Sequence, residues 1–539
     1  MKKNWLSYIC MAVLLSGILS SCNESSFLDL KDPNHFTGDN FWKNKADAES
    51  ALAAAYSPIK YQMYGYFGAF DGWLNLNGRG DDIFTITNEE PGMWAIANFQ
   101  NSPTTGNDPY GALFTGVQRA NVVLRYIDNV PATGITEEDR SMIKGEALFL
   151  RGYQYFLLVN NYKEVPLRII PSNEDEPNKP AASEAVLWKQ AEDDLTEAIK
   201  CNLPVTRVAD EKGRIEKGAA IAMLAKVYLT QHKYPEAKAQ LDLLLKAPYY
   251  PGRYNLMENF AENFTTAKEN NEESVFELQY SSDGDLTWGN ESGINLGSSI
   301  PQFIGPVNSG GWAKIMPTSF IVGQFISEER PAGADTKFDK RMYPSLFFNP
   351  EALGDVVKNE SWYGGNYSME KLWEGNAGKM AGGAPTFSMG DGKFLLKKYT
   401  AYYVNDEAAD KEGKANNVRV MRFAEVLLMY AEACAKTNDV TGASYALKLI
   451  RERAGLADKT FTQDQLMDQI EHQCLLEFFG EGHRFDDLKR WYTTNEIKTI
   501  LKANDKQGAD NFQERNRYYP IPTGELNNNS AMQQIDLWK

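Results

Sequence analysis

The sequence is poor in the residues that build metal sites and disulfide scaffolds. It contains four histidines, far apart along the chain, and five cysteines among 539 residues. The histidines show no spacing typical of metal ligands, and five cysteines are too few for a disulfide scaffold. We therefore expect no transition-metal site and no cofactor, and we expect the cysteines of the helical segments to be buried thiols.

Long apolar runs are scarce as well. The one clear run, Ile9–Leu19, follows a short basic segment at the N-terminus. It is too short for a transmembrane helix, which needs about 20 residues, and it fits the hydrophobic part of a secretory signal. The sequence Leu-Ser-Ser-Cys that ends at Cys22 is similar to a lipobox. We predict a lipoprotein signal peptide over residues 1–21 and a lipid anchor on Cys22; the alternative is an ordinary signal peptide followed by an incidental cysteine.

The chain has no excess of positive charge. Lys and Arg number 56 against 72 Asp and Glu, which gives a net charge of −16. A nucleic-acid-binding protein would show a basic surface, so this balance argues against that class. The same charge weakly disfavours sulfated or uronic-acid polymers as ligands, because repulsion would oppose their encounter.

Familiar catalytic signatures are missing too. The sequence has no Gly-x-Ser-x-Gly elbow, zinc-binding His-Glu-x-x-His, phosphate-binding loop or Cys-x-x-Cys. Asp81-Asp82 and Glu89-Glu90 have the composition of a glycosidase carboxylate pair, but acidic doublets in loops are usually solvated. Asp283, Asp285 and Glu291 leave Ca²⁺ binding as an alternative to a metal-free protein. The segment Glu481–Trp491 is rich in acids and bases, and we interpret it as structural.

What the sequence has in abundance is helical periodicity. The pairs Ala225/Ala237 and Ala431/Ala443 are each twelve residues apart, and both lie within apolar patterns of period 3.6. This is the spacing at which small residues let the two helices of a tetratricopeptide repeat approach closely. A third copy starts at Gly152 and resumes at Ala191 after an insertion. We therefore predict a mainly α fold, a tetratricopeptide-like helical solenoid.

A different composition interrupts these repeats. Residues 284–392 hold 18 of the 42 glycines in 109 positions, together with four tryptophans. Glycine in a helix interior costs about 1 kcal/mol, so this region is predicted as loops with a few short strands, for example at Ser274–Gln279 and Phe394–Val404. We expect one integrated domain over 22–539. Its helical scaffold covers about 40–250 and 415–500, and its loop-rich insert covers about 251–414.

An ordered series of sequence blocks runs from the lipobox to the C-terminus. The blocks are Phe27–Asp29, Phe41-Trp42, Ala51–Tyr56, Gln118–Asn121, Gly145–Tyr155, Arg214–Leu229, Arg422–Ala433, Ile450–Leu456, Glu481–Trp491 and Tyr519–Glu525. This ordered set resembles the SusD/RagB family of outer-membrane lipoproteins. The last stretch, Asn527–Gln534, departs from the family pattern by lacking an Asn-Pro.

The resemblance implies a function. Members of this family are surface-facing lipoproteins of the outer membrane that cap a TonB-dependent transporter of the SusC type and help deliver oligosaccharides into it. Some members, similar to RagB, bind peptides instead. The resemblance further implies that the protein is not an enzyme. A glycan-binding uptake protein is therefore the first hypothesis, a peptide-binding relative the second, and a surface glycoside hydrolase the third.

Sugar rings have an apolar face and a polar rim, so aromatic side chains next to amides, carboxylates and guanidiniums are candidate ligand groups. The loops that resemble the family's binding regions offer such groups, and each tryptophan has core packing as its alternative role. The predicted ligand-binding residues are Asp71, Trp73, Asn75, Arg79, Trp94, Asn98, Trp288, Asn290 and Trp312. The tryptophans among them are expected in exposed loops, with at least two forming the sugar platform. Trp188, on a helical apolar pattern, is expected in the core.

Overall fold

The computed structural model describes residues 41–60, 72–85, 91–105, 109–282, 296–380, 392–411 and 413–539. The chain divides into two units, Met1–Lys43 and Asn44–Lys539, and the following concerns the second. Several predicted features lie outside the described residues: the signal peptide, Cys22, Asp71, Glu89-Glu90, Trp288, Asn290 and the calcium alternative at Asp283, Asp285 and Glu291.

Helices dominate the described chain, which confirms the mainly α prediction. The first group comprises α4 (Lys45–Tyr56), α5 (Leu74–Gly78), α6 (Pro91–Ala97), α7 (Tyr110–Tyr126), α8 (Glu137–Tyr162), α9 (Glu184–Lys200), α10 (Lys217–Thr230) and α11 (Tyr234–Leu244). The insert contains α12 (Ile300–Ile304), α13 (Ser319–Ser327), α14 (Met342–Ser345) and α15 (Met369–Met380). The last group comprises α16 (Phe423–Lys436), α17 (Val440–Arg453), α18 (Gln463–Glu477), α19 (Arg484–Trp491), α20 (Thr494–Ala503) and α21 (Thr523–Asn528).

The strands of the described residues are short and pair two by two, always antiparallel. The pairs are β1 (Ile83–Thr85) with β3 (Ile315–Pro317), β2 (Ser274–Leu278) with β6 (Val418–Arg422), and β4 (Leu346–Phe347) with β5 (Leu395–Leu396). The strand expected at Ser274–Gln279 is confirmed as β2. The one expected at Phe394–Val404 is mostly wrong, because the chain turns at Lys397–Thr400 and Tyr399 has a positive φ of 67°.

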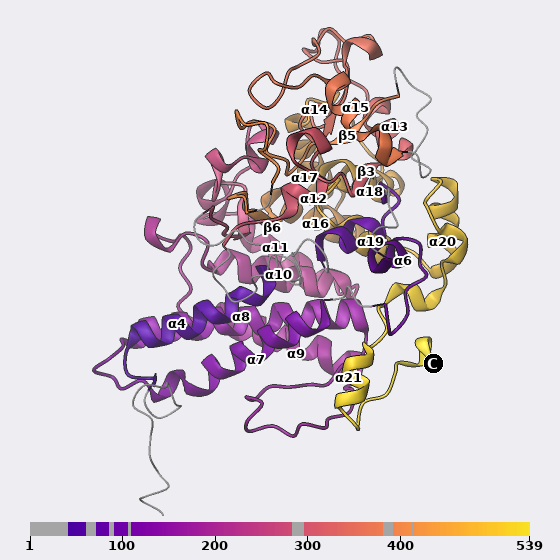
Figure 1. Ribbon diagram of the computed structural model, residues 1–539. Coiled ribbons are helices and arrows are strands. Elements are labelled where there is room, and N and C mark those ends of the chain that lie inside the picture. Colours follow the sequence, from indigo (N-terminus) through magenta and orange to yellow (C-terminus); the bar gives the residue numbers. More distant parts are fainter. Residues whose placement is uncertain are drawn as a thin grey trace, which may run out of the picture. The chain divides into compact units, whose positions relative to one another are not determined.

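The helices form an array that continues in space across the insert. Consecutive members pack in the order α4, α7, α8, α9, α10 and α11, and α11 then packs on α16, which contacts α17 and α18. Figure 1 shows α7, α8 and α9 alongside one another below α10 and α11, with α16 and α17 above them. The insert therefore leaves the solenoid without breaking it, as the repeat pattern predicts.

The small residues of the repeat pattern lie where neighbouring helices approach most closely. Ala225, Ala237, Ala431 and Ala443 are fully buried. Gly152 of α8 faces α9: a β-carbon there would lie 3.0 Å from the Leu195 side chain. The twelve-residue spacing thus reflects backbone contact between paired helices rather than a ligand site.

Strands β2 and β6 join the two ends of the insert, and a buried cluster of charges fixes the junction. Arg422, the last residue of β6, has ion pairs with Glu273, Glu477 and Glu481, the last two at 2.9 and 2.7 Å. All four side chains are almost inaccessible to solvent. Burial opposes the ionisation of Glu477, but the neighbouring arginines outweigh it and hold the pKa of that carboxyl well below its usual range.

Neither a disulfide nor a membrane-spanning helix occurs among the described residues. Cys434 and Cys474 are buried free thiols, as predicted, and Cys201 is a partly exposed one. No helix of the described chain is long and apolar enough to cross a bilayer.

Candidate functional site

Two of the predicted tryptophans lie on segments that adjoin the β1–β3 ribbon. Thr85, the last residue of β1, pairs with Ile315, the first residue of β3. Trp312 lies three residues before Ile315, so it is near the end of the ribbon at which β1 finishes and β3 starts. Trp94 lies in α6, which follows β1 in sequence and contacts it.

Trp94 is half-buried, so part of its indole remains accessible. Its helix is short and ends at Asn98, whose side chain donates a hydrogen bond back to the Trp94 carbonyl at 2.8 Å. Asn98 itself is buried. The predicted asparagine therefore caps the helix that carries the tryptophan.

Trp312 is also half-buried and lies over buried aromatic residues. Its ring centroid is 4.9 Å from that of Phe303 in α12, and the Lys314 ammonium lies 5.6 Å from its centre. The backbone N–H of Trp312 donates to the Gln302 carbonyl at 2.6 Å. One side of the indole is thus held by α12, which gives the ring a fixed orientation.

We call the part of the surface that carries Trp94 and Trp312 the tryptophan face. Ala313, next to Trp312, belongs to a buried core cluster against which Phe84 of β1, Trp373 of α15 and Tyr402 pack. These three aromatic residues are only partly buried, and none of them is among the predicted ligand-binding residues. The composition of residues 284–392 predicted loops around Trp373, and nothing local marked Phe84.

Trp73 and Asn75 are buried, so the expectation that they lie in an exposed loop is wrong. Only 1% of Trp73 is accessible, and its ring packs edge-on against Tyr399 with centroids 5.0 Å apart. The segment forms a helix at this point, and the Trp73 carbonyl accepts a hydrogen bond from Asn77 at 2.9 Å. Tyr399 lies more than 300 residues further along the chain, so a tertiary contact decides the position of this tryptophan.

Arg79 is also buried rather than available to a ligand. Its guanidinium lies between the rings of Phe485 and Tyr519, 4.4 and 4.5 Å from their centroids. It donates to the Asn161 side-chain oxygen at 3.3 Å. The tripeptide Arg79-Gly80-Asp81 therefore lies in the interior and offers no adhesion motif to a partner.

The acidic pair Asp81-Asp82 is buried, in contrast to the solvated doublet that the sequence suggests. Asp81 has an ion pair with Arg484 at 2.7 Å, and this pairing outweighs burial and lowers the pKa of the carboxyl. Burial and the adjacent Asp81 charge raise the pKa of Asp82 to about 7. Asp82 is 3% accessible, so it has no surface to present to a polymer.

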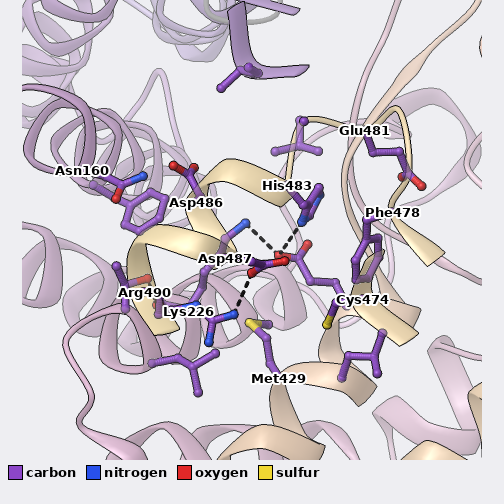
Figure 2. Close-up of a pocket in the computed structure, with 18 of the residues that line it drawn as sticks. Asn160, Lys226, Met429, Cys474, Phe478, Glu481, His483, Asp486, Asp487 and Arg490 are labelled. Carbon is purple, nitrogen blue, oxygen red and sulfur yellow. Dashed lines mark hydrogen bonds and ion pairs between the residues drawn. The ribbon is translucent and has the colours of Figure 1, made fainter. Parts of the chain in front are cut away.

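The Glu481–Trp491 segment lines a small, partly open cavity of about 80 Å³, to which α8, α10, α16, α18 and α19 contribute residues. Figure 2 shows its charged side chains turned toward one another. Lys226 pairs with Glu425 at 2.7 Å, and Arg490 pairs with Asp487 at 2.7 Å and with Glu432. Ligand sites usually need about 300 Å³ or more, so this cavity is too small for a sugar.

The protonation of this cavity also fits a structural role. Burial lowers the pKa of His483, which keeps its ring neutral near pH 7. Burial opposes the ionisation of Glu425, but the charge of Lys226 counteracts it, and the pKa of that carboxyl is lowered. The site thus holds a neutral imidazole beside a paired carboxylate, whereas acid–base catalysis needs a group with a pKa near the working pH in reach of substrate.

Larger open pockets occur elsewhere, with volumes of about 490, 480 and 330 Å³. The described residues that line them include none of the predicted ligand-binding residues. Among the described residues there is likewise no group of three or more His, Cys, Asp or Glu placed to hold a metal ion.

Two family models match the chain, one in each half. The model described as "SusD family" matches residues 272–538, and the model described as "Starch-binding associating with outer membrane" matches residues 26–229. Together the two leave few residues unmatched.

Individual relatives match over nearly the full length. The starch-binding protein SusD of Bacteroides thetaiotaomicron is 25% identical over 100% of this chain and 99% of its own length. Among solved structures, a SusD superfamily protein from Bacteroides vulgatus has a TM-score of 0.76 and 27% identity, covering 93% of this chain and 100% of that one. A laminarin-binding SusD-like protein has a TM-score of 0.71 and 26% identity, covering 92% of this chain and 99% of that one.

Proposed function

Because the chain belongs to the SusD/RagB family, we propose that it binds an oligosaccharide or polysaccharide at the tryptophan face and passes it to a TonB-dependent transporter of the SusC type in the outer membrane. Relatives whose names report ligands are a starch-binding and a laminarin-binding protein. Binding of glycans is thus a property of the family, and the ligand and partner of this chain are the proposal.

One observation carries the proposal for the site. Of the predicted tryptophans that lie among the described residues, Trp94 and Trp312 alone are partly accessible, and both lie on segments that adjoin the β1–β3 ribbon. Two accessible aromatic rings suit successive sugar units, each of which has an apolar face. Asp71, Trp288 and Asn290, which lie outside the described residues, are proposed as further ligand contacts.

We propose no catalytic role. Asp81 is paired with Arg484, and the carboxylates of the Glu481–Trp491 segment are paired with Arg and Lys side chains. A glycosidase needs two carboxyl groups that reach the bond to be cleaved, one on each side of it. The accessible part of the tryptophan face consists of aromatic side chains rather than a pair of carboxyl groups.

The experiment is incubation of the purified protein with a panel of polysaccharides that includes starch and laminarin, followed by an assay for new reducing ends. Retention of a glycan without new reducing ends supports the proposal. New reducing ends that persist after further purification would show a hydrolase. A screen with peptides provides the second arm, and selective peptide binding would favour the RagB-like alternative.

The location of the protein requires a separate test. We propose that Cys22 carries a lipid that anchors the protein to the outer membrane, facing the cell surface, where the transporter lies. Two or more acyl chains give stable attachment. The Cys22→Ala variant should therefore appear in the soluble fraction and no longer co-purify with the transporter from membranes. Unchanged membrane retention would contradict the anchor.

A further inference from the structure

The segment 504–516, between α20 and α21, contacts the backbone of the strand and helix that lead to Trp94. We call this segment the brace. It begins directly after α20 and contains the 3₁₀ turn Ala509–Asn511 and most of a second turn, Glu514–Arg517. Figure 1 shows α6, α19 and α20 on the same side of the unit. The brace lies about 400 residues along the chain from β1, so its contacts here are purely tertiary.

The first contact point is Thr85, the residue at which β1 ends. The Thr85 N–H donates to the side-chain oxygen of Gln507 at 3.0 Å, and the Gln507 amide donates to the Thr85 carbonyl at 3.2 Å. Strand β3 occupies the other edge of β1. The Gln507 amide thus takes the place that a third strand would have on β1.

The second contact point is the end of α6, directly after Trp94. Asn511 donates to the Asn98 carbonyl at 3.0 Å, and Asn516 donates to the Phe99 carbonyl at 3.2 Å. Gly508 has a positive φ of 73°, and a β-carbon at this position would lie 2.5 Å from the Asn98 Cα. The brace therefore approaches α6 at backbone distance, which only glycine permits here.

Apolar packing fixes the brace itself. Phe99 packs with Phe485 of α19, Leu501 of α20 and Phe512 of the brace, all of them buried. Phe99 adopts a positive φ of 57°, a conformation that a bulky residue takes only when its surroundings impose it. The brace is thus a rigid part of the core rather than a loose loop.

We infer that Gln507 is a positioning residue of the ligand site. Gln507 holds Thr85, which precedes Trp94 in the sequence, while the asparagines of the brace hold Asn98 and Phe99, which follow it. These contacts fix the tryptophan face before a glycan arrives. This inference rests on the proposed function, since it assigns a role to the same face. Preorganisation of this kind raises affinity by reducing the entropy lost on binding.

The chain offers a matched control. Gln534 is also half-buried, and it holds both backbone groups of Ile521 in the same way, at 2.9 and 3.0 Å. Replacing either glutamine by alanine removes one backbone-mimicking pair of hydrogen bonds. Of the two, only Gln507 contacts β1, the strand that precedes the helix of Trp94 and packs against it.

The experiment compares Gln507→Ala, Gln534→Ala and Trp94→Ala by titration calorimetry with the glycan retained from the panel, and by hydrogen exchange without ligand. We expect the affinity of Gln507→Ala to fall about tenfold, with faster exchange at residues 85 and 91–99. Gln534→Ala should bind as the wild type does, with a similar small change in melting temperature. Normal affinity in Gln507→Ala while Trp94→Ala binds weakly would overturn the inference and leave the proposed function intact.

If the wild-type protein retains no glycan, the proposed function fails and hydrogen exchange alone decides about the brace. Faster exchange at 91–99 in Gln507→Ala, absent in Gln534→Ala, then supports its positioning role. Equal exchange in the two variants overturns it.

Discussion

The helical array and the segment from Trp73 to Phe99 bury their side chains for different reasons. In the array, burial follows the local period: Trp188 lies on the apolar stripe of α9 and is buried. In the second segment, Trp73 directly precedes the short helix α5 and Trp94 lies in the short helix α6; Trp73 packs against the distant Tyr399 and is buried, whereas Trp94 stays partly accessible. Local pattern thus predicts the scaffold, whereas the site depends on tertiary partners.

The largest loss of stability is expected at the β2–β6 junction, where the insert leaves the helical array. Arg422→Ala removes the cation shared by Glu273, Glu477 and Glu481. Breaking one buried ion pair costs about 3–5 kcal/mol, and here three carboxylates lose a partner, so we expect a loss of about 5 kcal/mol or more, or a failure to fold. Urea denaturation measures it. Replacing exposed Lys189, whose partner Asp193 is also exposed, should cost less than about 0.5 kcal/mol.

Trp73→Ala tests whether the second region has a true core. Removal of this buried ring should destabilise the protein by about 3–5 kcal/mol, because a cavity remains against Tyr399. Trp94→Ala should cost about 1 kcal/mol or less, since its ring is already partly in water. Equal denaturation curves for the two variants would remove the distinction between core and face.

The same distinction shows what could be predicted from the sequence. The spacing of small residues predicted all three helix pairs of the repeats, including the one that is split between Gly152 and Ala191, because helix pairing is encoded locally. The burial of Arg79 and Asp82 could not be predicted, because the neighbouring residues Phe485, Tyr519 and Arg484 lie hundreds of positions away in the sequence. Composition indicated loops over residues 284–392, but the structure forms helices α12 to α15 there, and composition contained no signal for which indole remains accessible.

Helix packing in the array provides a third test. Gly152→Ala places a methyl group 3.0 Å from side-chain atoms of Asp194 and Leu195. We expect a loss of about 1–3 kcal/mol as α8 and α9 move apart. The control is Gly111→Ala at the start of α7, where nothing lies within 4 Å of the new methyl group. There the gain in helix propensity should stabilise the protein by about 0.5–1 kcal/mol.

The smallest change in stability should come from the pH-dependent ionisation of Asp82. Its pKa is raised to about 7 in the folded protein, chiefly by burial. Between about pH 4 and pH 7 the unfolded chain releases this proton while the folded chain keeps it, so the group lowers stability as the pH rises. Asp82→Asn should therefore stabilise the protein by about 1–2 kcal/mol at pH 8 and have almost no effect at pH 4. A gain that is equal at both pH values would contradict the raised pKa.

The most direct test of the central claim is titration calorimetry of the cognate glycan with Trp94→Ala, Trp312→Ala and Trp188→Ala, each accompanied by urea denaturation. A stacked ring is worth about 1–3 kcal/mol, so each of the first two variants should bind roughly ten- to two-hundred-fold more weakly and remain nearly as stable as the wild type. Trp188→Ala should bind normally and unfold at lower urea, since its ring packs 6.0 Å from that of Phe156 within the array. Normal affinity in both Trp94→Ala and Trp312→Ala would contradict the assignment of the tryptophan face as the glycan site.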